Sequence, residues 1–195
     1  MKIIAATHNK GKIKEIQKIL GALGAEVMTQ DEIGITIEPE ENGTTFAENA
    51  LIKARAVAEL CDYAVIADDS GLCVDVLGGA PGVYSARYAG EGASDADKIK
   101  KLLSELSGQD NRSAKFVSAI AFILPDGEEI VTHGEVFGRI TETVHGEGGF
   151  GYDPVFFSEE LGKTFGEATS DEKNAVSHRS RGLNALFDIL AERNI

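Results

Sequence analysis

Residues 63–71 read YAVIADDSG and join an apolar run to a pair of carboxylates. The run 63–67 is too short for a helix and rich in residues that favour strands, so it predicts a buried β-strand. We expect the strand to end at Asp68, Asp69 and Ser70, where an aspartate can also act simply as a turn former. Because successive strand residues face opposite sides of a sheet, the two carboxylates are not expected to share one site.

Strands and helices alternate along the rest of the chain. Short apolar runs predict strands at 2–6, 25–29 and 114–124, and the last run is apolar on both faces, as expected of a central strand. Apolar residues at helical spacing predict helices over the following ranges: 11–20, which ends at Gly21, 45–60, 94–106 and 177–190. Residues 125–127 predict a turn into a hairpin arm over 129–138. These elements predict an α/β fold with a mixed sheet, because βα units flank a hairpin.

The composition is that of one globular domain spanning residues 1–195. The chain has 19 Lys and Arg against 32 Asp and Glu, a formal net charge of −13, which argues against a protein that binds nucleic acid through its phosphates. No apolar run approaches the roughly 18 residues that span a bilayer, and the first residues lack a secretory signal. We therefore expect no membrane partner and a cytoplasmic location. Cys61 and Cys73 lack metal-ligand spacing and are expected to be reduced thiols.

The segment 7–12 (THNKGK) connects the first predicted strand to the first predicted helix. The N-terminus of a helix offers free backbone N–H groups and the positive end of the dipole, which suits a phosphate group. The segment is not a Walker A loop, since the first glycine is missing and Ile13 follows Lys12. The alternative is a capped surface helix with solvated lysines.

Acidic residues gather in two segments that could hold a metal. Asp68 and Asp69 supply hard oxygen ligands, and Mg²⁺ usually takes one or two carboxylates together with water and phosphate. Glu38, Glu40 and Glu41 form an acidic loop that is either merely solvated or converges with an aspartate on one site.

Two glycine-rich stretches, 76–92 and 146–154, predict loops that can approach a ligand closely. Phe150 and Tyr152 lie in the second of these loops. An aromatic ring there either stacks on a nucleobase or fills the core of the protein.

Basic side chains gather at the start of the last predicted helix, in the segment 177–181 (SHRSR), with Lys173 shortly before it. Cations in the first turn of a helix oppose the helix dipole, so these side chains need a negative partner. Either a bound anion or the neighbouring Asp171 and Glu172 could supply it.

Several segments closely resemble the inosine triphosphate pyrophosphatase family, and they occur in the same order. They are 7–12 (THNKGK), 48–54 (ENALIKA), 67–90 (ADDSGLCVDVLGGAPGVYSARYAG), 149–157 (GFGYDPVFF) and 177–181 (SHRSR). The resemblance implies an enzyme that hydrolyses ITP, dITP and XTP to the nucleoside monophosphate and pyrophosphate. It also implies an elongated, two-lobed α/β fold around a long mixed sheet flanked by helices, an active-site cleft between the lobes, a homodimer and dependence on Mg²⁺.

Residue by residue, the resemblance implies that Asp69 is the catalytic base and a metal ligand, and that Glu40 is the second metal ligand. It implies substrate contacts at Thr7, His8, Asn9, Lys10, Gly11, Lys12, Ser70, Phe150, Gly151, Tyr152, Asp153, Lys173, His178 and Arg179. In this scheme Asp69 activates a water that attacks the α-phosphorus, and pyrophosphate leaves. The loop at Phe150 holds the base, while His178 and Arg179 read its 6-oxo group.

A triphosphate with its metal carries net negative charge. This charge would pair with three cations that we expect to be unpaired: Lys12, Lys173 and Arg179. One alternative is a pyrophosphatase of related fold that acts on pyrimidine or modified nucleotides. The other is a non-enzymatic nucleotide-binding protein. The combination of Asp69 with Lys12 disfavours the latter, since binding alone does not need a metal-bridging carboxylate.

Overall fold

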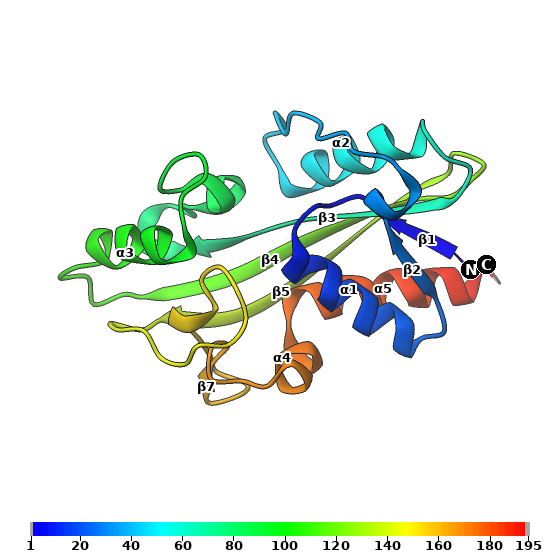
Figure 1. The fold of residues 1–195 in the computed structure, drawn as a ribbon. Helices are drawn as coiled ribbons and strands as arrows, with labels where there is room; N and C mark the ends of the chain where they lie inside the picture. Colours follow the sequence, from blue (N-terminus) through cyan, green and yellow to red (C-terminus); the bar gives the residue numbers. More distant parts are fainter. Residues whose placement is uncertain (1, 194–195) are drawn as a thin grey trace. The chain divides into compact units, whose positions relative to one another are not determined.

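The computed structural model describes residues 2–193, which contain a seven-stranded sheet of order β2-β1-β3-β4-β5-β6-β7 (Figure 1). The strands are β1 (Lys2–Ala5), β2 (Glu26–Thr29), β3 (Ala64–Val74), β4 (Ser113–Ile123), β5 (Glu129–Ile140), β6 (Phe156–Ser158) and β7 (Lys163–Thr164). The α-helices are α1 (Lys10–Ala22), α2 (Phe46–Ala58), α3 (Asp95–Glu105), α4 (Ser170–Val176) and α5 (His178–Glu192). β1 is parallel to β2 and β3, whereas β6 is antiparallel to β5 and β7, so the predicted mixed sheet is confirmed.

The described residues form two compact units. The first comprises residues 2–69, 118–134 and 178–193, and the second comprises residues 70–117 and 135–177. β3, β4 and β5 each contribute residues to both units. Each unit has an apolar core of its own.

The first unit buries apolar side chains on both faces of its strands. α1 and α5 pack together and cover one face, where Ile16, Ile66 and Leu186 are buried in one cluster (Figure 1). α2 covers the other face, where Ala50 packs in a second cluster with Val65. Val65 and Ile66 are neighbours in β3 but belong to different clusters, because successive side chains of a strand point to opposite faces. The same alternation decides where the next residues of β3 point.

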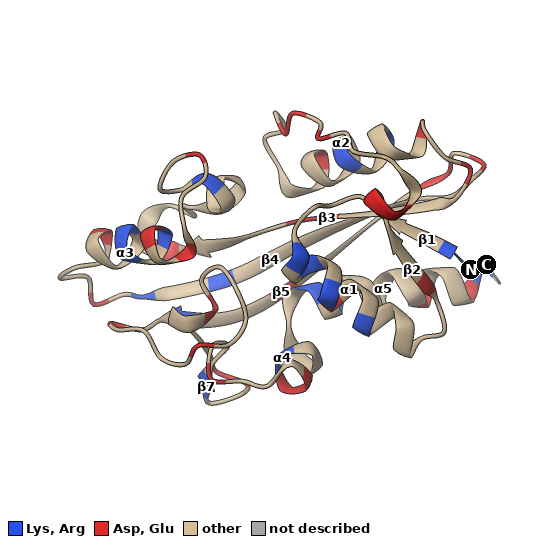
Figure 2. Cartoon of the chain, in the orientation of Figure 1, with Lys and Arg blue, Asp and Glu red and all other residues tan. Residues whose placement is uncertain are grey.

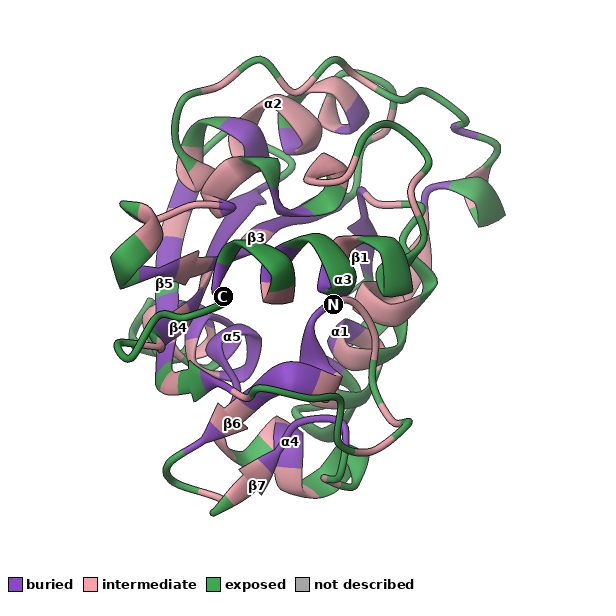
Figure 3. Ribbon diagram, turned by 90° about the vertical axis from the view of Figure 1, so that its left-hand side faces the viewer, coloured by how far each residue is buried: buried purple, intermediate pink, exposed green. Residues whose placement is uncertain are grey.

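The second unit is built around α3 and a group of aromatic rings. Ile99 and Leu102 of α3 are buried, while most positions of this helix are exposed (Figure 3). The ring centroids of Phe116 and Phe156 lie 4.6 Å apart, and those of Phe156 and Phe165 lie 5.1 Å apart. Rings at these separations pack favourably, so the aromatic group anchors the core of this unit.

Helix starts follow the capping signals of the sequence. Thr45 and Glu48 form a capping box at α2, and Ser94 and Asp97 form another at α3. Thr169 begins α4 in the same way, although the sequence analysis assigned no helix there. In each box, two backbone N–H groups that have no acceptor within the helix donate hydrogen bonds to side-chain oxygens.

Two element ends differ from the prediction. β3 was expected to end at Asp68, but it continues to Val74, because cationic side chains neutralise its carboxylates and so allow them to be buried in a strand. α1 was expected to end at Gly21, but it runs to Ala22. The left-handed residue beyond it is Gly24, with φ of 83°, and its N–H bonds to the carbonyl of Gly21 at 3.0 Å.

Cys61 and Cys73 are free thiols, as predicted, and burial raises the pKa of the Cys73 thiol. Among residues 2–193, every helix is too short or too polar to cross a membrane.

Candidate active site

Asp68 is fully buried on the face of β3 that α1 and α5 cover. Its carboxylate lies 2.9 Å from the Lys12 ammonium and 2.9 Å from the Arg179 guanidinium. It also accepts a hydrogen bond from the Ser118 hydroxyl at 2.5 Å, and Arg179 pairs in addition with Glu15 of α1. Burial alone would raise the pKa of Asp68, but Arg179 and Lys12 hold it well below its usual value. In these contacts two carboxylates, Asp68 and Glu15, face two cations, Lys12 and Arg179.

Asp69 points to the opposite face of β3, toward α2. Its Oδ1 lies 3.0 Å from the Lys53 ammonium, and its Oδ2 accepts a long hydrogen bond of 3.4 Å from Asn49. The same ammonium lies 3.0 Å from the Glu41 carboxylate. Burial raises the pKa of Asp69, although Lys53 and, without direct contact, Lys12 oppose this shift. The prediction that the two neighbouring aspartates face different sites is confirmed.

The Asp69 group carries one cation for two carboxylates, unlike the balanced group around Asp68. Because Lys53 bridges Asp69 and Glu41, the two carboxylates converge on a position that suits a cation. Hard oxygen donors of this kind fit Mg²⁺, which completes its shell with water and phosphate oxygens. Among residues 2–193 no cluster of three or more His, Cys, Asp or Glu could hold a metal, so bound water or substrate would have to supply further ligands. Glu40, the expected second ligand, is exposed, and its neighbour Glu41 is the residue that reaches Lys53.

The loop before α1 is organised by Asn9. The Asn9 side-chain oxygen accepts hydrogen bonds from the backbone N–H groups of Gly11 and Lys12, at 2.9 and 3.1 Å. The Asn9 N–H in turn donates to the Thr7 hydroxyl at 3.1 Å. These bonds fix the loop at the positive end of the helix dipole, and Figure 2 shows the basic residues that follow along α1.

His8 and Lys10 lie on the exposed side of this loop. The His8 Nδ1 lies 3.3 Å from the Asp31 carboxylate, and its Nε2 lies 3.2 Å from the carbonyl oxygen of Ile37. Burial lowers the pKa of His8, but the Ile37 carbonyl and Asp31 raise it overall. His8 therefore connects this loop to the segment that leads to the acidic residues 38–41.

The start of α5 lies in close contact with β5. A Cβ atom at Gly134 would lie 2.0 Å from the carbonyl oxygen of His178, so only glycine fits there. This approach places His178 and Arg179 inside the first unit, where they are 4% and 1% exposed. The negative partner expected for this helix start is Asp68, which Arg179 reaches from its first turn.

A second group of predicted residues lies within the second unit. The Lys173 ammonium lies 2.6 Å from the Asp153 carboxylate and 4.7 Å from the centre of the Phe150 ring. The same carboxylate accepts the Phe150 N–H at 2.9 Å. Gly149 has φ of 72°, and a Cβ there would lie 2.0 Å from Asp153, so glycine is required for this turn.

The expectation that Lys12, Lys173 and Arg179 lack carboxylate partners was wrong. Lys12 and Arg179 share Asp68, and Lys173 pairs with Asp153. Some partners lie far along the sequence, as Asp68 and Arg179 are 111 positions apart, so local charge patterns do not reveal them.

Two further predicted residues have clear positions. Tyr152 is buried in the core of the second unit, and its hydroxyl donates to the carbonyl of Ser85 at 2.8 Å. The core alternative for this aromatic side chain is therefore the one observed. Ser70 is half-buried in β3 and is the first residue of the second unit.

The sequence analysis did not single out Asn49, Lys53, Glu15 or Ser118. A signal existed for the first two, since residues four apart on a helix share one face, and both lie in the segment 48–54. Glu15 and Ser118 carried no such signal, because their roles come from contacts between distant elements.

Comparison with known proteins gives consistent matches over nearly the whole chain. A family model described as the Ham1 family matches residues 3–189. A dITP/XTP pyrophosphatase of Bacillus subtilis (strain 168) is 52% identical over 189 residues, which cover 96% of each chain. One from Haemophilus influenzae is 51% identical, over 95% of this chain and 96% of that protein. The solved structure of the Staphylococcus aureus Ham1 protein matches with a TM-score of 0.88 and 41% identity, over 99% of this chain and 100% of that chain. A nucleoside-triphosphatase, dITP/XTP pyrophosphatase, of Mycobacterium abscessus matches with a TM-score of 0.75 and 43% identity, over 95% of this chain and 98% of that chain.

Proposed function

The chain belongs to the Ham1 family, and we propose that it hydrolyses ITP, dITP and XTP to the nucleoside monophosphate and pyrophosphate. One observation carries this proposal at the site: Asp69 and Glu41 hold a single lysine ammonium between them and leave one negative charge over. Such a group suits a triphosphate that arrives with a divalent cation. The activity would keep these non-standard purine nucleotides out of DNA and RNA.

Mg²⁺ is the proposed cofactor, held by Asp69 together with either Glu41 or Glu40. The contact of Glu41 with Lys53 supports Glu41, whereas the family resemblance implies Glu40. When bound there, Mg²⁺ would neutralise phosphate charge and make a bound water more acidic.

Asp69 is the proposed general base, which takes the proton of the water that attacks the α-phosphorus. Its near-complete burial and its shared lysine keep the carboxylate oriented. Lys12 and the backbone of the loop 7–12 would bind the phosphates, with Lys12 dividing its ammonium hydrogens between Asp68 and the substrate. Pyrophosphate leaves readily when its charge is screened in this way.

Stacking on the base is assigned to the loop of Phe150, within the second unit, and the family resemblance implies further substrate contacts at Lys173, His178 and Arg179. Phe150 is held by backbone and cation–π contacts and would stack on the purine. A 6-oxo group accepts hydrogen bonds where the 6-amino group of adenine donates them, so a donor that contacts this position would favour ITP over ATP. Tyr152 would support this loop from the core, through its bond to Ser85.

The proposal is tested by pyrophosphate release from a panel of nucleotides with Mg²⁺. We expect strong turnover of ITP and XTP and weak turnover of ATP, UTP, dTTP and CTP. A preference for pyrimidines would favour the related-fold alternative, and binding without turnover would favour a non-enzymatic protein. EDTA should abolish turnover and added Mg²⁺ should restore it.

We further propose that the working form is a cytoplasmic homodimer that acts on free nucleotides and not on nucleic acid. The two units would form a single domain, because β3, β4 and β5 run through both. Light scattering on the protein as it elutes from a size-exclusion column tests the dimer. One cooperative unfolding transition in calorimetry would support the single domain.

A further inference from the structure

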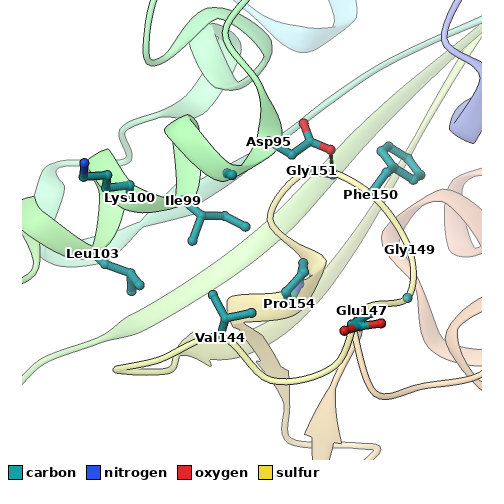
Figure 4. A pocket seen from close by; sticks show the side chains of 12 residues that line it. Asp95, Ile99, Lys100, Leu103, Val144, Glu147, Gly149, Phe150, Gly151 and Pro154 are labelled. Atoms are coloured by element: carbon teal, nitrogen blue, oxygen red, sulfur yellow. Dashed lines mark hydrogen bonds between the residues drawn. The ribbon is translucent and has the colours of Figure 1, made fainter.

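The loop 147–151, which carries Phe150, borders a cavity of about 550 Å³ within the second unit (Figure 4). Ile99 and Leu103 of α3, with Val144, form part of the opposite wall, and the Phe150 ring projects away from them. Because this space separates the loop from α3, side-chain packing on that side does not fix the position of the loop. Its position must come from other contacts.

Besides a bond from the Gly148 N–H to the Gly166 carbonyl oxygen at 2.8 Å, two carboxylates hold the backbone of this loop. Asp153 accepts the Phe150 N–H at 2.9 Å, and Asp95 accepts the Gly151 N–H at 2.6 Å (Figure 4). Asp153 belongs to the loop's own turn, whereas Asp95 is the first residue of α3 and lies 56 residues away in the sequence. Among the described residues, the hydrogen bond from Gly151 to Asp95 therefore links this loop to α3 across the cavity.

Asp95 is itself held in place. Its other carboxylate oxygen lies 2.6 Å from the Lys98 ammonium, one turn along α3. Burial would raise the pKa of Asp95, but Lys98 and the Gly151 N–H lower it overall, so the group stays ionised at neutral pH. A hydrogen bond to an ionised acceptor is stronger than one between neutral groups. The backbone of Gly151 thus has a fixed anchor although the loop borders open space.

We propose that Asp95 is a positioning residue for nucleotide recognition: by accepting the Gly151 N–H, it holds Phe150 where the ring can stack on the purine. This inference rests on the proposed function, and it concerns how the base is bound. A purine stacked on Phe150 gains the same contact before and during phosphoryl transfer. Loss of the anchor should therefore raise KM and leave kcat nearly unchanged.

The test compares three variants by steady-state kinetics with ITP. We expect Asp95→Ala to raise KM roughly tenfold, as for loss of a hydrogen bond to a charged group, with kcat within about twofold of the parent value. Asp95→Asn keeps an oxygen that can accept the Gly151 N–H, so it should recover most of the lost affinity. Asp97→Ala is the matched control, because it also removes an acidic residue and a capping contact from the first turn of α3 but does not touch the loop.

Hydrogen exchange at residues 147–153 without nucleotide gives a second readout that does not depend on the substrate. Faster exchange in Asp95→Ala but not in Asp97→Ala, together with the rise in KM, would support the proposal. Unchanged exchange, equal effects of the two alanine variants, or faster exchange with an unchanged KM would each overturn it. If the parent protein does not turn over ITP, the proposed function fails, while exchange still decides whether Asp95 anchors the loop.

Discussion

The two faces of β3 in the first unit carry neighbouring aspartates in opposite electrostatic situations. On one face Asp68 is enclosed by two cations and a hydroxyl, and Glu15 completes a balanced group. On the other face Asp69 shares one ammonium with Glu41, so one negative charge is left over. Burial of a carboxylate is common to both faces. The number of cations for each carboxylate is what separates a structural ion pair from a candidate catalytic group.

Substitution of Asp68 should have the largest effect. Asp68→Asn removes the carboxylate that both buried cations, Lys12 and Arg179, contact, and an uncompensated buried charge costs about 3–5 kcal/mol. Urea unfolding followed by circular dichroism measures this loss of unfolding free energy. The matched variant Asp69→Asn leaves Lys53 paired with Glu41 and neutralises a carboxylate whose pKa is raised by burial, so its cost should be smaller than that of Asp68→Asn. Equal destabilisation by the two variants would remove the distinction between the two faces.

The second prediction concerns turnover at Asp69. Asp69→Asn keeps the shape of the side chain but removes the proposed base and a proposed anionic metal ligand. We expect kcat for ITP to fall on the order of a hundredfold or more, while nucleotide binding persists. Pyrophosphate release at saturating ITP gives kcat, and calorimetric titration gives the affinity. A variant that retains more than about a tenth of the parent kcat would exclude Asp69 as the base.

The third prediction distinguishes two neighbouring glutamates. Glu41→Gln should raise the Mg²⁺ concentration needed for half-maximal activity by about tenfold or more, because Glu41 converges with Asp69 on one cation position. Glu40→Gln should change it by less than about twofold, since Glu40 is exposed. A Mg²⁺ titration of both variants distinguishes the two glutamates. A larger rise in the Mg²⁺ requirement for Glu40→Gln than for Glu41→Gln would identify Glu40 as the ligand.

The smallest expected effect is a pH dependence that touches neither aspartate. His8 has a pKa raised above 6.5, so its protonated form contributes stability that is full below pH 6.5 and is lost as the pH rises through the raised value. The ring is partly exposed and its contacts are screened, so the change should stay below about 0.5 kcal/mol. Urea unfolding between pH 6 and pH 8 should show it in the parent chain and not in His8→Asn. An equal pH dependence in the parent chain and in His8→Asn would assign the change in stability to another titrating group.

Local rules were enough for part of this site. The strand period predicted that Asp68 and Asp69 face apart, and the spacing of apolar residues predicted the helices that begin after Thr45 and Ser94. These features depend on residues only a few positions apart, which a single sequence displays directly. The family resemblance supplied the prediction that Asp69 is catalytic, which no local rule contains.

Other features depend on contacts between distant segments. β3 continues to Val74, and the burial of its Asp68 is compensated by Lys12 and Arg179, which lie 56 and 111 positions away in the sequence. β6 and β7 are three and two residues long, too short to show a period. The preference for Glu41 over Glu40 at Lys53 depends on the backbone path of an irregular loop, which composition does not encode.

The close approach at Gly134 has a consequence for inherited variation. Glycine and alanine codons differ by one nucleotide, yet a single added methyl group here would meet the His178 carbonyl at 2.0 Å. The start of α5 would have to shift, and Arg179 would move with it away from Asp68. An alanine scan of the glycines should therefore find a disabling lesion at this chemically inert position, with a loss of thermal stability comparable to that of Asp68→Asn. In a survey of natural alleles, a change from glycine to alanine here would be classed as conservative although it disrupts the protein.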